Sequence, residues 1–220
     1  MASRRHPAEL EEREDLAPRS GADLRLHPVT ADADRALAHH VADVVGVQPD
    51  EIRVGRHCPA CGAVSHGRPW ARVEGTADGS TEARGRADGG TGAPCRTDGR
   101  ATAGRGAATS PHPVLGVSLS RSGPHLLTAV RVGGGIGVDL EEIAAVDRGW
   151  NPALVLHPAE AVQNRTAEDR ARLWAGKEAV LKLLGTGLRT PMPEVRLAEH
   201  DLREAEAPDG FVILVALSQS

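Results

Sequence analysis

The sequence predicts an α+β fold. Patterns typical of strands and of helices occupy separate stretches: alternating strands between residues 114 and 141, helices between 158 and 184, and strands again near the C-terminus. This order differs from the regular alternation of strand and helix that builds a parallel α/β sheet. With 220 residues, 40% of them hydrophobic, the chain can bury a substantial core.

The N-terminal region combines a few short elements with two polar stretches. Residues 1–22 are rich in charged side chains, so we expect a disordered arm there. A short strand is predicted at Leu24–His27, a helix at Thr30–Val45 and a further strand at Ile52–Arg56. Residues 75–110 contain nine glycines and eight alanines but no Leu, Ile, Val, Phe, Met or Trp. Because nothing in this stretch offsets the entropy of ordering it, a disordered insertion is predicted.

Apolar residues return at Val114 and begin the second region of predicted structure. Strands at 114–120, 126–132 and 135–141 are separated by glycine-containing turns, which predicts a short antiparallel meander. The remaining predicted elements are the start of a helix at Pro158–Gln163, the clearest helix of the chain at Glu168–Leu184, and closing strands at Val195–Leu197 and Phe211–Ala216.

Two carboxylates share one face of the strand predicted at 135–141. Asp139 and Glu141 alternate with apolar residues, so their Cα atoms lie roughly 6–7 Å apart on the same side of the strand. Carboxylates at this spacing can bind one hard cation such as Mg²⁺, which combines one or two of them with phosphate oxygens and water. The alternative is a solvated acidic strand end.

Lysine is confined to one helix of this sequence. The chain has 26 basic side chains, but only Lys177 and Lys182 are lysines. Trp174, Glu178 and Lys182 follow at four-residue intervals and therefore share a helix face, with Lys177 lying between. A third carboxylate and two ammonium groups beside an acidic metal site would suit a polyphosphate substrate. In isolation, a Glu–Lys pair at this spacing is equally typical of a solvated helix surface.

Two segments together resemble the paired signature of the 4′-phosphopantetheinyl transferases. Gly137–Glu141 is similar to the G-(I/V)-D-x-E element of that family, and Trp174–Lys182 is similar to its W-x-x-K-E-A-x-x-K element. Weaker resemblances are found at His66–Pro69 to a G-(K/R)-P element, at Ser118–Ser122 to an S-x-S-H-S element, and at Gly185–Leu188 to a glycine turn. The chain length resembles the larger, surfactin-type branch.

This resemblance implies both a fold and a reaction. The fold would be pseudo-dimeric, with two similar α+β halves and the active site between them. The N-terminal half would span 23–125, interrupted by the insertion at 75–110, and the C-terminal half, with the metal and catalytic motifs, would span 126–220. The reaction would be the Mg²⁺-dependent transfer of the 4′-phosphopantetheine arm of coenzyme A to a serine of an apo acyl or peptidyl carrier protein, with release of 3′,5′-ADP.

The resemblance also implies roles for individual residues. Asp139 and Glu141 would bind Mg²⁺, with Glu178 as third ligand, as base, or as both. The catalytic pair would be Glu178 and Lys182, the lysine neutralising charge on the phosphates. The residues implied in substrate binding are Arg35, Arg68, Ser120, Arg121, Lys177 and Lys182. Arg121 stands where the family has histidine; it can bind phosphate, but it cannot act as a neutral imidazole.

Cys58 and Cys61 form a second candidate site. A C-x-x-C pair with His57 and His66 nearby can begin a zinc site, although the sequence lacks the second ligand pair of a closed structural site. The alternative is a rigid turn with two reduced thiols. Two other functions therefore stay open: a zinc-dependent interaction module, and a catalytically degenerate relative that binds coenzyme A or a carrier protein without transfer.

Composition restricts the partners and the location that we expect. A net charge of −4 argues against a general nucleic-acid binder. No apolar run approaches the roughly 20 residues that span a bilayer, and the first residues lack the apolar centre of a secretory signal. Three cysteines do not form a disulfide framework. We expect a cytoplasmic monomer with no nucleic-acid or membrane partner.

Overall fold

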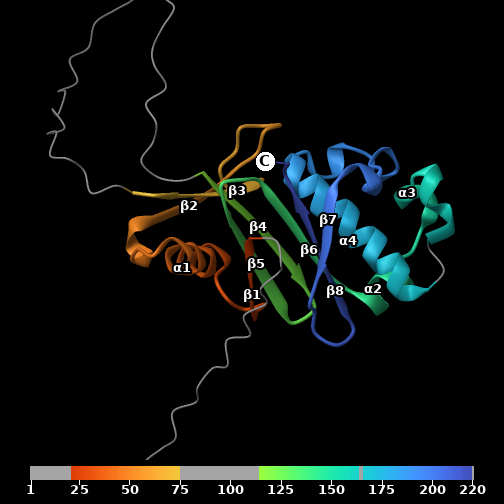
Figure 1. The fold of residues 1–220 in the computed structure, drawn as a ribbon, viewed down its shortest axis with the longest axis horizontal. Helices are drawn as coiled ribbons and strands as arrows, with labels where there is room; N and C mark the ends of the chain where they lie inside the picture. Colours follow the sequence, from red (N-terminus) through yellow and green to blue (C-terminus); the bar gives the residue numbers. More distant parts are fainter. Residues whose placement is uncertain (1–20, 75–113, 164–165, 220) are drawn as a thin grey trace, which may run out of the picture.

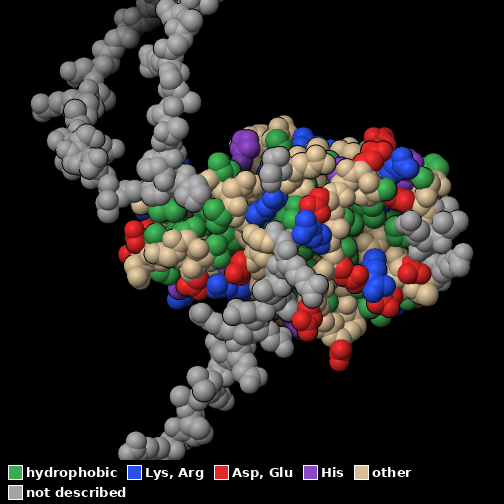
Figure 2. Space-filling model, in the orientation of Figure 1, with side chains coloured by type: hydrophobic (Ala, Val, Ile, Leu, Met, Phe, Trp, Pro, Cys, Tyr) green, Lys and Arg blue, Asp and Glu red, His purple; other side chains and the backbone are tan. Residues whose placement is uncertain are grey.

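The computed structural model describes residues 21–74, 114–163 and 166–219. The predicted N-terminal arm, up to residue 20, and the predicted insertion at 75–110 lie outside the described residues. No helix in the described ranges has the length and apolar character needed to cross a membrane. The face seen in Figure 2 carries acidic and basic side chains interspersed with apolar ones.

The first sheet has three antiparallel strands in the order β1-β5-β4. Its strands are β1 (Ala22–Pro28), β4 (Leu115–Ser122) and β5 (His125–Val132). Helix α1 (Ala33–Val45) begins at the capping side chain of Asp32 and covers one face of this sheet. A separate hairpin follows α1 and is formed by β2 (Ile52–His57) and β3 (Arg68–Val73).

The second sheet is also antiparallel, in the order β6-β8-β7. Its strands are β6 (Ile136–Glu142), β7 (Asp201–Ala205) and β8 (Phe211–Leu217). The long helix α4 (Ala167–Leu184) packs on one face of this sheet. Shorter helical segments connect β6 to α4 and α4 to β7: α2 (Ile143–Arg148), α3 (Pro152–Val155), and 3₁₀ turns at Pro158–Gln163, Gly187–Arg189, Met192–Glu194 and Leu197–Glu199.

The two sheets pack face to face between the two long helices, as Figure 1 shows. Alternation along each strand explains these layers. In β5, Leu127 faces the second sheet while Val130 faces α1; in β8, Val215 faces the first sheet while Leu214 faces α4. Each sheet takes one strand that precedes a long helix in the chain and a hairpin that follows this helix. In both sheets the last strand of the hairpin lies in the centre. The chain crosses between the sheets after Val132, whereas the expected boundary at 125/126 falls at the start of β5.

Serine hydroxyls connect the sheets where β4 runs beside β6. Ser118, Ser120 and Ser122 alternate along β4, so their hydroxyls point to the same side, toward β6. The Val138 N–H donates to the Ser118 hydroxyl at 3.0 Å, and the Glu142 N–H donates to the Ser122 hydroxyl at 3.1 Å. Since β6 forms its main-chain ladder with β8, these hydroxyls satisfy N–H groups on its other edge.

Several predicted elements need correction. The three strands from 114 to 141 do not form one meander, because β6 pairs with β8 instead of β5. No strand forms at Val195–Leu197, where the chain makes 3₁₀ turns; the strand that pairs with β8 is Asp201–Ala205. Strand β3 and helices α2 and α3 were not predicted. The predictions for β1, α1, β2, α4 and β8 are confirmed to within a few residues.

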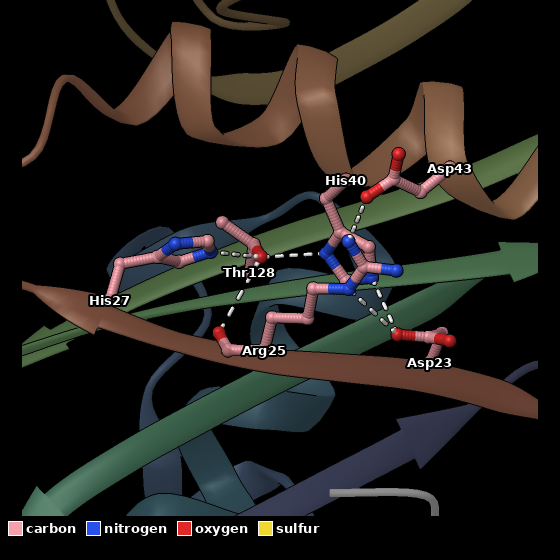
Figure 3. A network of polar contacts seen from close by, with 6 residues as sticks. All are labelled: Asp23, Arg25, His27, His40, Asp43 and Thr128. Carbon is pink, nitrogen blue, oxygen red and sulfur yellow. Dashed lines mark hydrogen bonds and ion pairs between the residues drawn. The ribbon is translucent and has the colours of Figure 1, made fainter. Parts of the chain in front are cut away.

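A buried histidine fastens α1 to the first sheet (Figure 3). His40 is 1% exposed, with its Nδ1 2.6 Å from the Thr128 hydroxyl and its Nε2 2.8 Å from an Asp23 carboxylate oxygen. Burial lowers the pKa of His40 to about 4, and although the hydrogen bond with Asp23 opposes this, Arg25 lowers it further. His40 is therefore a buried structural residue of α1.

Candidate active site

Three carboxylates from two elements face one cavity of about 420 Å³. Strand β6 contributes Asp139 and Glu141, and helix α4 contributes Glu178. Strand β4 closes another side with Ser120 and Arg121. The site therefore lies where the edges of the two sheets meet, against the helix of the second sheet.

Asp139 is the most deeply buried of the three carboxylates, at 2% exposed. Its Oδ1 accepts a hydrogen bond from the Ser120 hydroxyl at 2.7 Å and lies 2.5 Å from the Lys182 ammonium nitrogen. Its Oδ2 is buried and, among the described residues, has no hydrogen-bond partner. A buried carboxylate oxygen without a partner is costly. This position is therefore suited to an additional ligand with positive charge.

The two glutamates at the cavity have raised pKa values. Glu141 accepts hydrogen bonds from the Trp174 indole N–H at 3.1 Å and from the Ser122 hydroxyl at 3.4 Å. Burial, followed by repulsion from Asp139, nevertheless raises the pKa of Glu141 to about 7. The same two causes, in the same order, raise the pKa of Glu178. Negative charge is thus concentrated in the cavity beyond what Lys182 offsets.

One face of α4 is directed at these carboxylates. Trp174, Glu178 and Lys182 all line the cavity, as their four-residue spacing predicts. The helix approaches β6 closely because Gly137 has no side chain: a Cβ there would lie 2.0 Å from the carbonyl oxygen of Ala179. The glycine in the predicted strand thus decides how near the α4 side chains come to the carboxylates of β6.

Lys177 lies on another side of α4 and does not line the cavity. It is fully buried, with its ammonium nitrogen 2.5 Å from a Glu160 carboxylate oxygen and donating to the carbonyl of Val195. Glu160 also accepts the N–H groups of Leu197 and His157. Burial raises the pKa of Glu160, but these hydrogen bonds and Lys177 outweigh it, and the net effect is a lowered pKa. The geometry gives Lys177 a structural position instead of the substrate-binding one expected for it.

A second cavity of about 450 Å³ continues from the first and shares Arg56, Leu119, Glu178 and Lys182 with it. Its lining includes three arginines from different elements: Arg56 of β2, Arg68 of β3 and Arg189 of the turn after α4. Arg56 is held by an ion pair of 2.6 Å with Asp34 of α1. Arg guanidinium groups suit phosphate because their planar donors bind two oxygens at once.

Of the other residues predicted to bind substrate, some line these cavities and one does not. Arg68 and Arg121 line them, and Ser120 does so while its hydroxyl contacts Asp139 and Lys182. Arg35 is exposed on α1 and lines neither cavity. Sequence reasoning missed Arg56 and Arg189, because in a chain with so many arginines their type carries no signal. The position of Arg189 just after the glycine turn could have indicated it.

The chemistry of the three carboxylates fits a bound cation, although their oxygens are farther apart than the ligand atoms of a compact metal site. In the described parts of the chain, three ligand atoms lie within 4.8 Å of one another only in Cys58, Cys61 and His66, so the three carboxylates surround their cavity more loosely. Oxygen ligands suit Mg²⁺. The unpartnered Oδ2 of Asp139 and the raised pKa values of both glutamates fit a divalent cation, which would relieve their repulsion.

Comparison with known families found one similarity, in the C-terminal part of the chain. Residues 135–214 match the family model of the 4′-phosphopantetheinyl transferase superfamily. The matched stretch runs from β6 into β8 and contains the three carboxylates, Trp174 and Lys182. A search of curated proteins found no match. The superfamily match suggests phosphopantetheine transfer in general for this region. The match includes neither the first sheet nor the β2–β3 hairpin. The assignment of the arginines of β2, β3 and β4 to the site therefore rests on geometry alone.

Proposed function

We propose that this protein transfers the 4′-phosphopantetheine arm of coenzyme A to a serine of an acyl or peptidyl carrier protein and releases 3′,5′-ADP. The observation that carries the proposal is the convergence of Asp139, Glu141, Glu178 and Lys182 in one cavity within the superfamily match. Acidic metal ligands beside a lysine are what phosphoryl transfer needs, since its catalysis rests on positioning and charge neutralisation.

The substrate-binding part of the proposal rests on the second cavity. Arg56, Arg68 and Arg189 surround it, and it opens directly to Glu178 and Lys182. Coenzyme A carries phosphates at two separated positions, so a groove with several arginines can hold one group while the diphosphate reaches the carboxylates. Arg121 lines the first cavity, and it would bind a phosphate oxygen there. We do not include Lys177, because it is fully buried in its pair with Glu160.

Asp139, Glu141 and Glu178 would hold Mg²⁺. When bound there, the ion would supply positive charge to the phosphate oxygens of the substrate. Ser120 keeps Asp139 in place by donating a hydrogen bond to Oδ1, which leaves Oδ2 available as a ligand. Trp174 and Ser122 orient Glu141 in the same way. The surfactin-type lineage and the pseudo-dimeric arrangement of two halves belong to this proposal as well.

Glu178 and Lys182 would act on the reacting groups. The serine oxygen of the carrier attacks the phosphorus that bears pantetheine, a new P–O bond forms, and the bond to the 3′,5′-ADP phosphate breaks. Glu178 takes the serine proton, and its raised pKa suits a base operating near neutral pH. Lys182 neutralises charge on the leaving phosphate. The lysine is partly exposed, so it can shift from Asp139 toward a substrate.

The experiment is incubation of the purified protein with an apo carrier protein, coenzyme A and Mg²⁺, followed by mass spectrometry of the carrier. Transfer adds roughly 340 Da to the carrier, the mass of one phosphopantetheine arm attached through a phosphoryl group. Acyl and peptidyl carriers tested side by side identify the partner class. An unchanged carrier mass, with coenzyme A binding retained, would instead support the degenerate relative that binds without transfer.

A matched pair of variants tests the site. Asp139→Asn removes the charge that holds the cation, and we expect transfer to fall by about 10²-fold or more. Asp147→Asn changes an aspartate of α2 that pairs with Arg170 and does not line the cavity, so transfer should be retained. Near-normal transfer by the Asp139 variant at saturating Mg²⁺ would contradict the metal assignment.

A further inference from the structure

The loop that connects β2 to β3 brings two thiols and an imidazole together. The ligand atoms of Cys58, Cys61 and His66 all lie within 4.8 Å of one another. The Cys61 sulfur and the His66 Nε2 are 3.4 Å apart. Two such atoms bound to one tetrahedral zinc ion, at about 2.3 Å for sulfur and 2.0 Å for nitrogen, would be separated by roughly 3.5 Å. The observed distance therefore already matches that of two zinc ligands.

The backbone of this loop prepares Cys58 to bind a metal. Its turn is closed by hydrogen bonds from the Cys58 N–H to the Ala63 carbonyl and from the Gly62 N–H to the Cys58 carbonyl, at 2.9 and 2.8 Å. The N–H groups of Cys61 and Ala60 both donate to the Cys58 sulfur. The turn therefore fixes the position of this sulfur beside the Cys61 sulfur and the His66 imidazole.

A glycine brings the histidine to the thiols. Gly67 has a φ of 100°, and a Cβ there would lie 2.4 Å from the carbonyl oxygen of His57 and 2.6 Å from the Cα of Cys58. Only glycine permits so close a crossing of the two chain segments. This crossing places His66, the preceding residue, beside the C-x-x-C turn, so that His66 rather than His57 joins the two thiols as the third ligand.

Packing of apolar side chains does not explain the order of this loop. None of the side chains from Cys58 to Gly67 is buried, and Val64 is 76% exposed. The loop nevertheless borders the second cavity, which Cys58, Pro59 and Ala60 line beside Arg68. A metal ion would hold this exposed loop in place where a core does not.

We propose that Cys58, Cys61 and His66 bind one zinc ion, which fixes the β2–β3 loop at the edge of the second cavity. Thiolate and imidazole ligands select zinc over the oxygen-preferring Mg²⁺ and Ca²⁺. Three protein ligands leave the fourth tetrahedral position to water. The zinc is distinct from the cation proposed for the carboxylates, and its site lies outside the region that matches the superfamily.

The test uses the full chain, reduced and stripped of metal by a chelator, with zinc titrated against a chromophoric competitor. We expect one equivalent to bind. Cys61→Ser removes one of the four zinc ligands and should weaken zinc binding by roughly a hundredfold. This factor corresponds to about a quarter of the binding free energy of a typical four-coordinate zinc site. His66→Ala should have a similar effect. Cys95→Ser, at the third cysteine of the chain, is the matched control and should bind zinc like the wild type.

Two further readouts separate a zinc site from a turn with free thiols. Cobalt substituted for zinc should show sulfur-to-metal charge-transfer absorption, reduced in Cys61→Ser and unchanged in Cys95→Ser. Zinc should also slow amide hydrogen exchange at residues 58–67 without changing the circular dichroism spectrum. Binding of less than one equivalent, or binding that survives Cys61→Ser, would overturn the proposal. None of these measurements involves coenzyme A or transfer, so their outcome is independent of the proposed enzymatic function.

Discussion

Replacement of Lys177 by methionine tests whether the two lysines of α4 have different roles. Methionine keeps most of the side-chain volume but removes the charge that pairs with Glu160 at 2.5 Å. Both side chains are essentially inaccessible to solvent, so the variant leaves an uncompensated buried carboxylate. Breaking a buried pair in this way costs about 3–5 kcal/mol of unfolding free energy. For a chain of this size, that lowers the Tm by roughly 10 °C.

The pH dependence distinguishes this mechanism from a simple packing defect. In the wild type the pKa of Glu160 is lowered, so its stabilisation is present above about pH 4.5 and is lost as the pH falls through the folded-state pKa. In Lys177→Met, burial without a cation raises the folded-state pKa of Glu160 above its unfolded value. Protonation then favours the folded variant, so part of its lost stability returns as the pH is lowered from neutral toward 5.

The measurement is urea unfolding followed by circular dichroism at several pH values. Arg172→Met is the matched control on the same helix, because Arg172 pairs with Glu204 and Glu168 at the surface. Removal of such an exposed pair should cost less than about 1 kcal/mol at any pH. If Lys177→Met lost no more stability than the control, or lost the same amount at every pH, the buried-pair argument would be refuted.

Three further outcomes follow from the geometry. Gly137→Ala places a carbon 2.0 Å from the Ala179 carbonyl oxygen and should lower the free energy of unfolding, measured in urea, by about 1–3 kcal/mol. In the control Gly149→Ala the nearest contact is 3.7 Å, so the free energy of unfolding should change by less than about 0.5 kcal/mol. Equal changes in the two variants would refute the close approach of α4 to β6. The pKa of His40 is lowered to about 4, so the imidazole of the unfolded chain takes up a proton first as the pH falls. The free energy of unfolding of the wild type should therefore decrease by up to roughly 3 kcal/mol between pH 6.5 and pH 4. His40→Asn should lack this pH dependence. If the proposed transfer is correct, Arg121→Ala should raise the KM for coenzyme A by about 10- to 100-fold and change kcat less; an unchanged KM would show that this arginine does not contact the substrate.

Local sequence patterns accounted for the central part of the candidate site. The two-residue period of a strand placed Asp139 and Glu141 on one face, and the helical period placed Trp174, Glu178 and Lys182 on another. These spacings are set by the backbone within one element, so they do not depend on the rest of the fold. Even so, Lys177 and Lys182 are five positions apart in α4, and this spacing turns their side chains to different sides of the helix.

Pairing between distant segments could not be predicted in the same way. Strand β6 could join the preceding hairpin or a strand near the C-terminus, and it pairs with β8 because its apolar face then covers the first sheet. The positions of His40 and Arg56 depend on how α1 and the β2–β3 hairpin pack against other elements. No periodicity within one segment reports such contacts.

The sequence by itself determined which side chains share a strand face or a helix face, because those relations follow from backbone geometry over a few residues. Only the tertiary structure decided which of those faces meet. It directed Lys182 to the carboxylates and Lys177 to Glu160, and through a close crossing at Gly67 it brought His66 to Cys58 and Cys61. Each of these contacts joins residues whose distance depends on the packing of several elements at once, and packing is a property of the whole folded chain.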